Sequence, residues 1–531
     1  MVVWLMLACS SELPQEQAYI PLADAEYLTR ISIDLRGIRP TVDELDRLSS
    51  NPSELDIFID EYLAHSNFGS RIRNIYAEIY NTEADQFSVQ PDLFNVDDEI
   101  AFIRSVGQEP LRILQEVADN DLPWTTIVTA DWTMANESMG SAFMTDYPQG
   151  ERGWKRTKYT DGRPMSGILS TNGLWWRYTT TNSNANRSRA NTISRVVLCY
   201  DYLRLPIQFS RDIDLFDNEA IEQAIKTDEA CINCHSSLDP LAAHLFGFWA
   251  PNTDSWLEIS RYHPEREQFY NTVLDVEPSY YGKPTTNLSD LGHHLAADPR
   301  FPNCTTQQLM TAFLQRDVRI DEINNISKHR EAFIQGNLNI KELVRSIIAD
   351  PQYKAGPQTE NADYAGLKMM TADLLSSTIE DLTGYKWTYS GHDMLRSDIY
   401  GLRTLAGGTD GYTVTQNARQ PNPTIILVQA RLAELAAHYA VDQEIQMPME
   451  DRHLFPHVEF SMTPTENPTD TQRQLQYLHL LVFGKSIQPD GPEIKANIDL
   501  WNRLYTIDNN TKSAWTGLLI ALLRDPDFLL Y

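Results

Sequence analysis

The sequence predicts a mainly α-helical protein of several domains with loop-rich insertions. Three observations lead to this class. The chain has 531 residues, which is too long for a single hydrophobic core. Its composition, 42% hydrophobic and 22% charged, is typical of folded globular proteins. Apolar residues recur at helical spacing in many stretches, for example at Ala25, Leu28, Ile31 and Leu35.

Capping residues bound the first two predicted helices. Gly37 can end the helix that starts near Ala25, because glycine readily adopts the left-handed conformation found after helix C-termini. Thr41 can cap the next helix, and Glu44 three residues later completes a capping box. The stretch 147–181 is rich in glycine, proline and aromatic residues and is predicted to form structured loops. Further helices are expected over 55–62, 186–203, 291–314 and 337–350.

Two pairs of segments resemble each other. In 346–353 and 521–528 an apolar helix precedes Asp-Pro, and an aromatic residue follows two positions after the proline. The proline should stop each helix, and the aromatic ring can fold back onto the apolar face. Segments 27–45 and 477–494 share a helix, a glycine, a proline and an acidic helix start. We interpret both pairs as repeated helical-hairpin units, too few to indicate a solenoid.

The most specific motif is Cys231-Ile232-Asn233-Cys234-His235. C-x-x-C-H is the attachment signature of c-type haem. Two thiols one helical turn apart can add to the two vinyl groups of a porphyrin, and the histidine that follows becomes the proximal iron ligand. The motif therefore predicts one covalent haem c, and it adds a cytochrome c-like haem-binding segment to the expected fold.

Three other interpretations of the cysteine pair remain open. A zinc site would need a second pair of ligands, but Cys9, Cys199 and Cys304 are isolated in the sequence. A thioredoxin-like redox pair would need a βαβ context, whereas the flanking residues favour helix and turn. The third alternative is a chance occurrence of the motif.

The sixth iron ligand would decide the chemistry. A methionine or histidine gives a closed, electron-transfer haem, whereas an open position permits peroxide chemistry. Met165, in the loop-rich stretch, is the first candidate for this distal ligand, and His294 and Met310 are alternatives. Core packing is the competing interpretation of each methionine.

Other residues could support the haem. Asp239 and Pro240 could end the haem helix, or Asp239 could accept the proton on the non-ligating nitrogen of His235. Arg187 and Arg189 could pair with haem propionates, or they could form a solvated helix face.

The first nine residues bear on the compartment. The apolar run 2–8 ends in Ala-Cys and resembles the end of a bacterial lipoprotein signal, in which Cys9 would be lipidated. The run is short and lacks a basic n-region, and a frayed apolar terminus is the alternative. No later stretch approaches the ~18 apolar residues of a membrane span, so the lipid would be the only membrane attachment. We expect a location in the bacterial periplasm or at the cell surface, as an outer-membrane lipoprotein.

The remaining cysteines and the net charge fit an exported protein. With Cys9 assigned to lipid and the C-x-x-C-H pair to haem, Cys199 and Cys304 are left over. They are a disulfide candidate in an oxidising compartment, or two independent buried thiols. The formal charge of −29 argues against nucleic acid and anionic lipid as partners, and it could steer a basic protein.

Several stretches together resemble planctomycete-type cytochrome proteins. The sequence R-I-S-I-D-L-R-G-I-R-P-T at 30–41 is similar to the R-x-S-x-D-L-x-G-x-x-P-T opening of their DUF1549 segment. Residues 167–170, 186–191 and 198–199 resemble the DUF1588 region, and C-I-N-C-H-S-S-L-D-P at 231–240 resembles its haem block. Stretches 291–353 and 404–411 are similar to DUF1585 and DUF1592 segments, respectively.

The resemblance implies an exported, mostly helical haem c protein with Cys231 and Cys234 as attachment points and His235 as proximal ligand. We expect a signal remnant, an N-terminal helical domain, a haem c domain, a linker and a C-terminal helical domain, over residues 1–9, 20–146, 147–355, 356–362 and 363–531.

The predicted function is electron transfer to an unidentified redox partner by a lipid-anchored monohaem cytochrome. A surface scaffold or binding lipoprotein with a structural haem is one alternative, favoured by length, because an electron carrier needs only about 100 residues. A haem peroxidase-like enzyme is another, but the single C-x-x-C-H argues against the second haem it would need.

Overall fold

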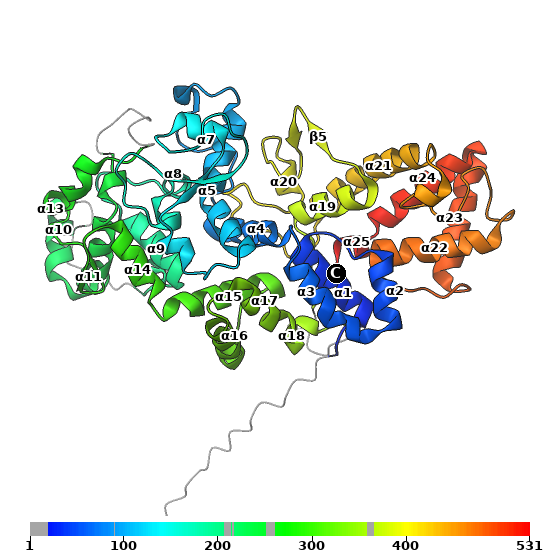
Figure 1. Cartoon of the computed structure of the whole chain (residues 1–531), viewed down its shortest axis with the longest axis horizontal. Coiled ribbons are helices and arrows are strands. Elements are labelled where there is room, and N and C mark those ends of the chain that lie inside the picture. The colour runs from blue at the N-terminus through cyan, green and yellow to red at the C-terminus, as the bar shows by residue number, and fades with distance from the viewer. Residues whose placement is uncertain (1–19, 90, 207–213, 215–216, 251–260, 358–365) are drawn as a thin grey trace, which may run out of the picture.

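The protein is mainly α-helical, as the sequence predicts. The computed structural model describes residues 20–89, 91–206, 214, 217–250, 261–357 and 366–531. Within these residues the strands form three antiparallel two-stranded sheets. Figure 1 shows an elongated molecule with α11 (Glu229–Ala243) near one end and α23 (Pro492–Asp508) near the other.

The N-terminal helices confirm the predicted caps. Gly37 ends α1 with a φ of 75°, and the Thr41 hydroxyl accepts a hydrogen bond from the Glu44 amide while the Glu44 carboxylate accepts one from the Thr41 amide. These local bonds satisfy backbone groups that a helix end leaves free. The helices of this part are α1 (Asp24–Arg36), α2 (Val42–Ser50), α3 (Leu55–Leu63), α4 (Phe68–Tyr80), α5 (Glu99–Asp119), α6 (Thr126–Thr129) and α7 (Glu137–Ala142).

The middle of the chain is less regular than predicted. The helix expected over 186–203 ends at Leu198, because Cys199 adopts a left-handed φ of 52°. The helix expected over 291–314 is broken, because Pro299 disfavours helix at the residue before it. The elements are β1 (Thr133–Ala135), β2 (Lys155–Thr157), α8 (Asn172–Arg177), α9 (Arg187–Leu198), α10 (Asn218–Thr227), α11, α13 (Tyr270–Val273), β3 (Ser279–Tyr280), β4 (Lys283–Pro284), α14 (Leu288–Ala296), α15 (Arg300–Leu314), α16 (Ile323–Gln335), α17 (Ile340–Ile348) and α18 (Pro351–Lys354).

Both Asp-Pro endings behave as predicted. Asp350 and Asp525 cap the short helices that begin at the following prolines, after α17 and α24 have ended. Tyr353 and Phe528 are buried. The C-terminal elements are α19 (Ala372–Thr383), β5 (Thr388–Tyr389), β6 (His392–Asp393), α20 (Leu402–Leu405), α21 (Pro423–Glu444), α22 (Pro468–Phe483), α23, α24 (Thr511–Arg524) and α25 (Pro526–Leu529).

Short 3-10 helices fill many of the turns between these elements. They are η1 (Pro52–Glu54), η2 (Pro91–Phe94), η3 (Gly167–Ser170), η4 (Tyr202–Arg204), η5 (Phe246–Phe248), η6 (Pro264–Phe269), η7 (Ile320–Glu322) and η8 (Met449–Asp451).

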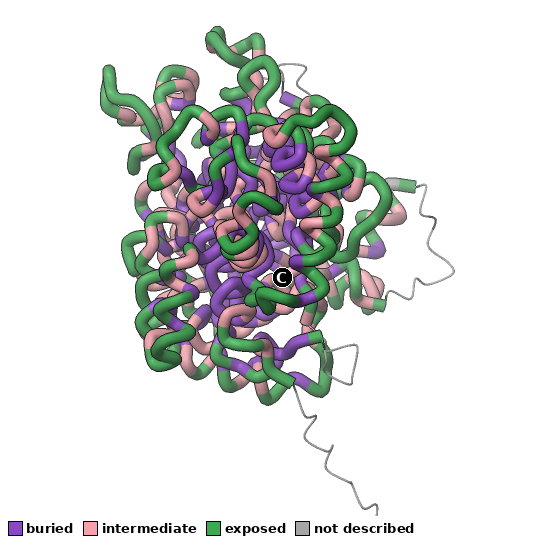
Figure 2. Tube along the Cα trace, turned by 90° about the vertical axis from the view of Figure 1, so that its right-hand side faces the viewer, coloured by how far each residue is buried: buried purple, intermediate pink, exposed green. Residues whose placement is uncertain are grey.

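Two large apolar cores stabilise the molecule, and Figure 2 shows buried chain running through its interior. The first core includes side chains from Tyr27 to Tyr353, on both sides of position 146, with α5 packed against α4 and α8. The second contains side chains from Met369 to Leu529 and is built around α21 and α24. Each core buries two tryptophans almost completely, Trp124 and Trp175 in the first and Trp501 and Trp515 in the second.

Helix α1 carries a buried polar cluster where these two cores meet. The Asp34 carboxylate accepts hydrogen bonds from Lys368 Nζ at 2.6 Å, from the Tyr353 hydroxyl at 2.6 Å and from the Tyr531 hydroxyl at 2.9 Å. The Arg30 guanidinium donates to the Tyr353 and Gly366 carbonyls. We call Arg30, Asp34, Tyr353, Lys368 and Tyr531 the seam cluster. It joins the first helix to the end of the first core and to the C-terminus.

Some expectations fall outside the described residues. They are the signal remnant 1–9 with its lipidation candidate Cys9, and residues 358–362 of the predicted linker. Among the described helices, none combines the length and apolar character that crossing a membrane requires.

Candidate haem attachment site

Helix α11 brings the three residues of the C-x-x-C-H motif together. Asp228 caps this helix, and its carboxylate accepts hydrogen bonds from the amides of Ala230 at 3.0 Å and Cys231 at 3.4 Å. Cys231, Cys234 and His235 follow within the first two turns. Their i, i+3, i+4 spacing puts them on one helix face. All three are half-buried, so this face is accessible from outside the core.

Both cysteines of the motif are free thiols. Burial raises the pKa of each thiol, and for Cys231 the nearby Asp228 carboxylate adds to the effect. Cys234 also packs against the first core. The pair therefore has the protonated, unpaired thiols that thioether formation starts from.

His235 is held by a buried ion pair. Its Nδ1 lies 2.8 Å from Asp239 Oδ1, and Arg187 donates to both oxygens of the same carboxylate, at 2.7 and 2.9 Å. Burial acts to raise the pKa of Asp239, but the hydrogen bonds from Arg187 and His235 outweigh it and hold this pKa below its usual range. Because Nδ1 faces the carboxylate, Nε2 is the ring nitrogen presented for a metal.

Pro240 does not end the helix, so that expectation is wrong. Helix α11 continues to Ala243, and Asp239 instead accepts from the His235 ring. Proline removes one hydrogen bond inside a helix, to the carbonyl four residues earlier. That carbonyl belongs to Ser236, which is exposed and can be hydrated.

The two arginines considered for the haem propionates have different surroundings. Arg187 is engaged by Asp239 rather than forming a solvated helix face. Arg189 is 2% exposed and donates to the carbonyls of Tyr178 and Phe248, so a propionate cannot reach it. Burial lowers the pKa of Arg189 to about 9.

Aromatic residues line the neighbourhood of α11. The Tyr202 hydroxyl lies 2.8 Å from Ser237 Oγ, and its ring packs edge-on against Tyr200. Strand β3 packs against α11 and carries Tyr280, whose ring is 4.9 Å from that of Tyr281. These rings form an amphipathic wall beside the motif, a surface that suits a planar, largely apolar cofactor.

The three distal-ligand candidates lie in different settings. Met310 is 1% exposed within the first core, so it packs there. Met165 is half-buried just before η3, which lies against α14. His294 on α14 stacks on Tyr280 and lies near His244, at the far end of α11 and about 13 Å along the helix axis from His235. The sixth ligand stays a prediction.

Cys199 and Cys304 are joined in a disulfide, with their Cα atoms 5.2 Å apart. The bond links the end of α9 to α15 and encloses α11 within a loop of 105 residues. The alternative of two independent thiols does not describe this structure.

No family model, curated protein or solved structure matches this chain. The likeness to planctomycete-type cytochromes therefore rests on the quoted residues and stays a prediction. In the part of the chain that the structure describes, no group of three or more His, Cys, Asp or Glu side chains could hold a metal ion by itself.

Sequence reasoning missed two polar clusters. One is the seam cluster, although the i, i+4 spacing of Arg30 and Asp34 places both charged residues on one face of the helix. The other is an arginine-lined cavity beside α4, whose residues come from stretches too far apart in sequence to form a motif.

We expect Asp239→Asn to lower the free energy of unfolding of the apoprotein by about 1–3 kcal/mol, because Arg187 loses a buried charged partner. Since the pKa of Asp239 is lowered from 3.8, the ion pair stabilises the fold above that value and is lost as pH falls through the folded pKa. The variant should therefore show a weaker acid dependence, measured by denaturant unfolding between pH 3 and 7. Asp275→Asn, from an exposed pair with Lys226, is the matched control and should change little. Equal stability of wild type and Asp239→Asn throughout would contradict the assignment.

Proposed function

We propose that the protein is an exported c-type cytochrome that takes part in electron transfer. One haem c would be attached to Cys231 and Cys234, with His235 as its proximal ligand. The observation that carries the proposal is the His235–Asp239–Arg187 arrangement on the same helix face as two free thiols. Such a carboxylate partner is what metal-binding histidines usually have.

Residues around His235 would orient the haem and shield it from water. Asp239 accepts from Nδ1 and fixes the plane of the His235 ring, and Arg187 keeps that carboxylate charged. Tyr200, Tyr202 and Tyr280 would limit the access of water from one side. When bound, haem c supplies a one-electron centre whose potential depends on this burial and hydrogen bonding.

The net charge of the chain indicates what kind of redox partner it would bind. With 73 acidic against 44 basic residues, the surface favours a basic partner protein and disfavours nucleic acid. Lipidation at Cys9 would anchor the protein to an outer membrane without a spanning helix.

A scaffold role with a structural haem is a second candidate, supported by the second core. That core, from Met369 to Leu529, lies towards the opposite end of the molecule from α11 (Figure 1). A separate core of this size is not needed to hold one haem, and it offers surface for docking or assembly.

Expression behind a cleavable export signal in a host with haem c maturation tests the proposal. We expect a pyridine haemochrome spectrum of the c type, haem that remains bound after denaturation, and a reduced haem that does not bind CO. Protein without covalent haem from such a host would contradict the proposal. Covalent haem that binds CO would instead indicate an open iron and favour the peroxidase-like alternative.

A further inference from the structure

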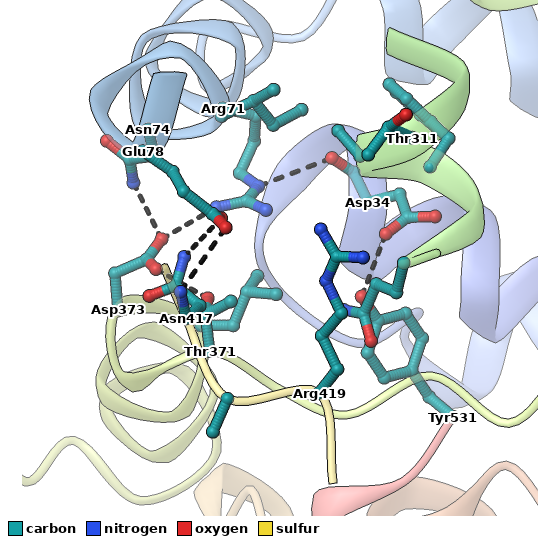
Figure 3. Close-up of a pocket in the computed structure, with 16 residues that line it drawn as sticks. Asp34, Arg71, Asn74, Glu78, Thr311, Thr371, Asp373, Asn417, Arg419 and Tyr531 are labelled. Atoms are coloured by element: carbon teal, nitrogen blue, oxygen red, sulfur yellow. Dashed lines mark hydrogen bonds and ion pairs between the residues drawn. The ribbon is translucent and has the colours of Figure 1, made fainter. Parts of the chain in front are cut away.

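A polar cavity of about 310 Å³ lies between α4, α5, α19 and the chain from Arg396 to Thr409. It adjoins a smaller polar pocket, shown in Figure 3, which shares Arg71, Asn74, Glu78, Asp373 and Asn417 with it. Three carboxylates face the larger cavity, from Glu78, Glu83 and Asp373. Six arginines line the same cavity: Arg36, Arg71, Arg73, Arg104, Arg396 and Arg403. The excess of positive charge is notable in a chain with a net charge of −29.

Two of these arginines form tight ion pairs within the protein. Arg71 forms an ion pair with Asp373 (Figure 3), with 2.7 Å between Nη1 and Oδ2, and Arg36 forms a bidentate pair with Glu44 at 2.9 and 3.0 Å. These distances are those of tight charge-assisted hydrogen bonds. Both pairs lie at the wall of the cavity, and in each of them a carboxylate neutralises the charge of the arginine.

Three other arginines are paired only loosely. Arg403 is 3.4 Å from Glu83, and Arg396 is 3.9 Å from its two carboxylate neighbours. Arg73 donates to the side-chain oxygens of Asn74 and Gln115, and among the described residues it forms no ion pair. Each of these guanidiniums has five N–H donors, so all three keep donors for an incoming group.

The charges of these arginines act on one another. Burial lowers the pKa of Arg73, the Glu83 and Asp373 carboxylates act against this shift, and the positive charge of Arg396 adds to it. Arg112, close behind, has its pKa lowered to about 9 by burial and by the charge of Arg73. A bound anion would therefore offset the repulsion between the positive charges of these neighbouring arginines.

We propose that this arginine cavity binds a small polyvalent oxyanion, with phosphate or carboxylate groups held by Arg73, Arg396 and Arg403. The planar guanidinium matches the paired oxygens of either group. The cavity volume suits a compact ligand rather than a polymer. The site is independent of the haem assignment, because none of its residues belongs to α11 or its aromatic neighbours.

Isothermal titration calorimetry of the full chain with inorganic pyrophosphate and, separately, citrate tests the proposal. We expect saturable binding of at least one of the two, and a rise in melting temperature that KCl of equal ionic strength does not reproduce. Arg73→Gln/Arg403→Gln should weaken the affinity about tenfold or more. Arg204→Gln removes an arginine whose side chain is 87% exposed, and it should bind as the wild type does.

A charge-conserving variant keeps the test independent of folding defects. Arg73→Lys retains the positive charge but loses the planar fork, so we expect a fold of unchanged circular dichroism and weaker binding. Absence of saturable binding of both anions, or equal affinity of Arg73→Gln/Arg403→Gln and wild type, would overturn the proposal. Binding of pyrophosphate alone would assign the site to phosphates, and binding of citrate alone to carboxylates.

Discussion

Replacing both Cys231 and Cys234 by alanine is expected to abolish covalent haem attachment while the helical fold is retained. Among the described residues, Cys231 and Cys234 are the only free thiols that could form thioether bonds, because Cys199 and Cys304 are joined in a disulfide. Both motif cysteines are half-buried near the start of the helix, so alanine removes little core volume and keeps a strong helix former. The measurement is haem that co-migrates with the denatured protein in a gel, together with the haemochrome spectrum.

Asn233→Ala is the matched control for this variant. Asn233 lies between the two cysteines, and its side chain is exposed, so its replacement should leave the haem content unchanged. His235→Ala should give protein with little stable haem, because the proximal ligand is lost. If the double cysteine variant kept as much covalent haem as Asn233→Ala, the attachment site would lie elsewhere.

Asp34→Ala is expected to lower the free energy of unfolding by about 3–5 kcal/mol, the cost of leaving a buried charge without its partner. Lys368 is 3% exposed, and burial lowers its pKa to about 8 even with Asp34 beside it. The same substitution removes the acceptor for the hydroxyls of Tyr353 and Tyr531. Because these partners come from both sides of the seam, both cores should lose stability.

An exposed ion pair provides the comparison. Asp60 pairs with Arg345 across α3 and α17, but its side chain is 66% exposed, so Asp60→Asn should have little effect. Asp34→Ala/Lys368→Met should be more stable than Asp34→Ala alone, because the buried charge of Lys368 is removed together with its partner. Denaturant unfolding followed by circular dichroism measures all three. An Asp34→Ala variant no less stable than Asp60→Asn would show that the seam cluster does not hold the two cores together.

Predictions that depend on neighbouring residues were confirmed. The capping box of Thr41 and Glu44, the glycine end of α1 and the two Asp-Pro endings all form between groups within a few positions of one another. Such interactions are decided by backbone geometry that a short sequence already specifies. The errors at Pro240 and at 291–314 also concern prolines, whose effect depends on whether a carbonyl can find water or another donor.

The sequence was sufficient to predict the haem-attachment residues, but not the residues that hold His235 in place. The spacing of Cys231, Cys234 and His235 was sufficient to predict an attachment motif. Whether Asp239 would end the helix or hold the histidine could not be decided from the sequence, because the answer depends on Arg187. That arginine lies 52 positions away and reaches the carboxylate only when α9 packs against α11.

The sequence by itself thus determined the helical class, the capping box of Thr41 and Glu44, the two Asp-Pro helix ends and the C-x-x-C-H motif, since these follow from local periodicity and spacing. Only the tertiary structure decided the disulfide, the ion pair behind His235, the seam cluster and the arginine cavity. Asp34 and Tyr531 are 497 positions apart, and Arg73 shares its cavity with Arg396 and Arg403. The physical reason is that burial, and not spacing, sets the strength of charged contacts, and burial is fixed only when distant helices pack together.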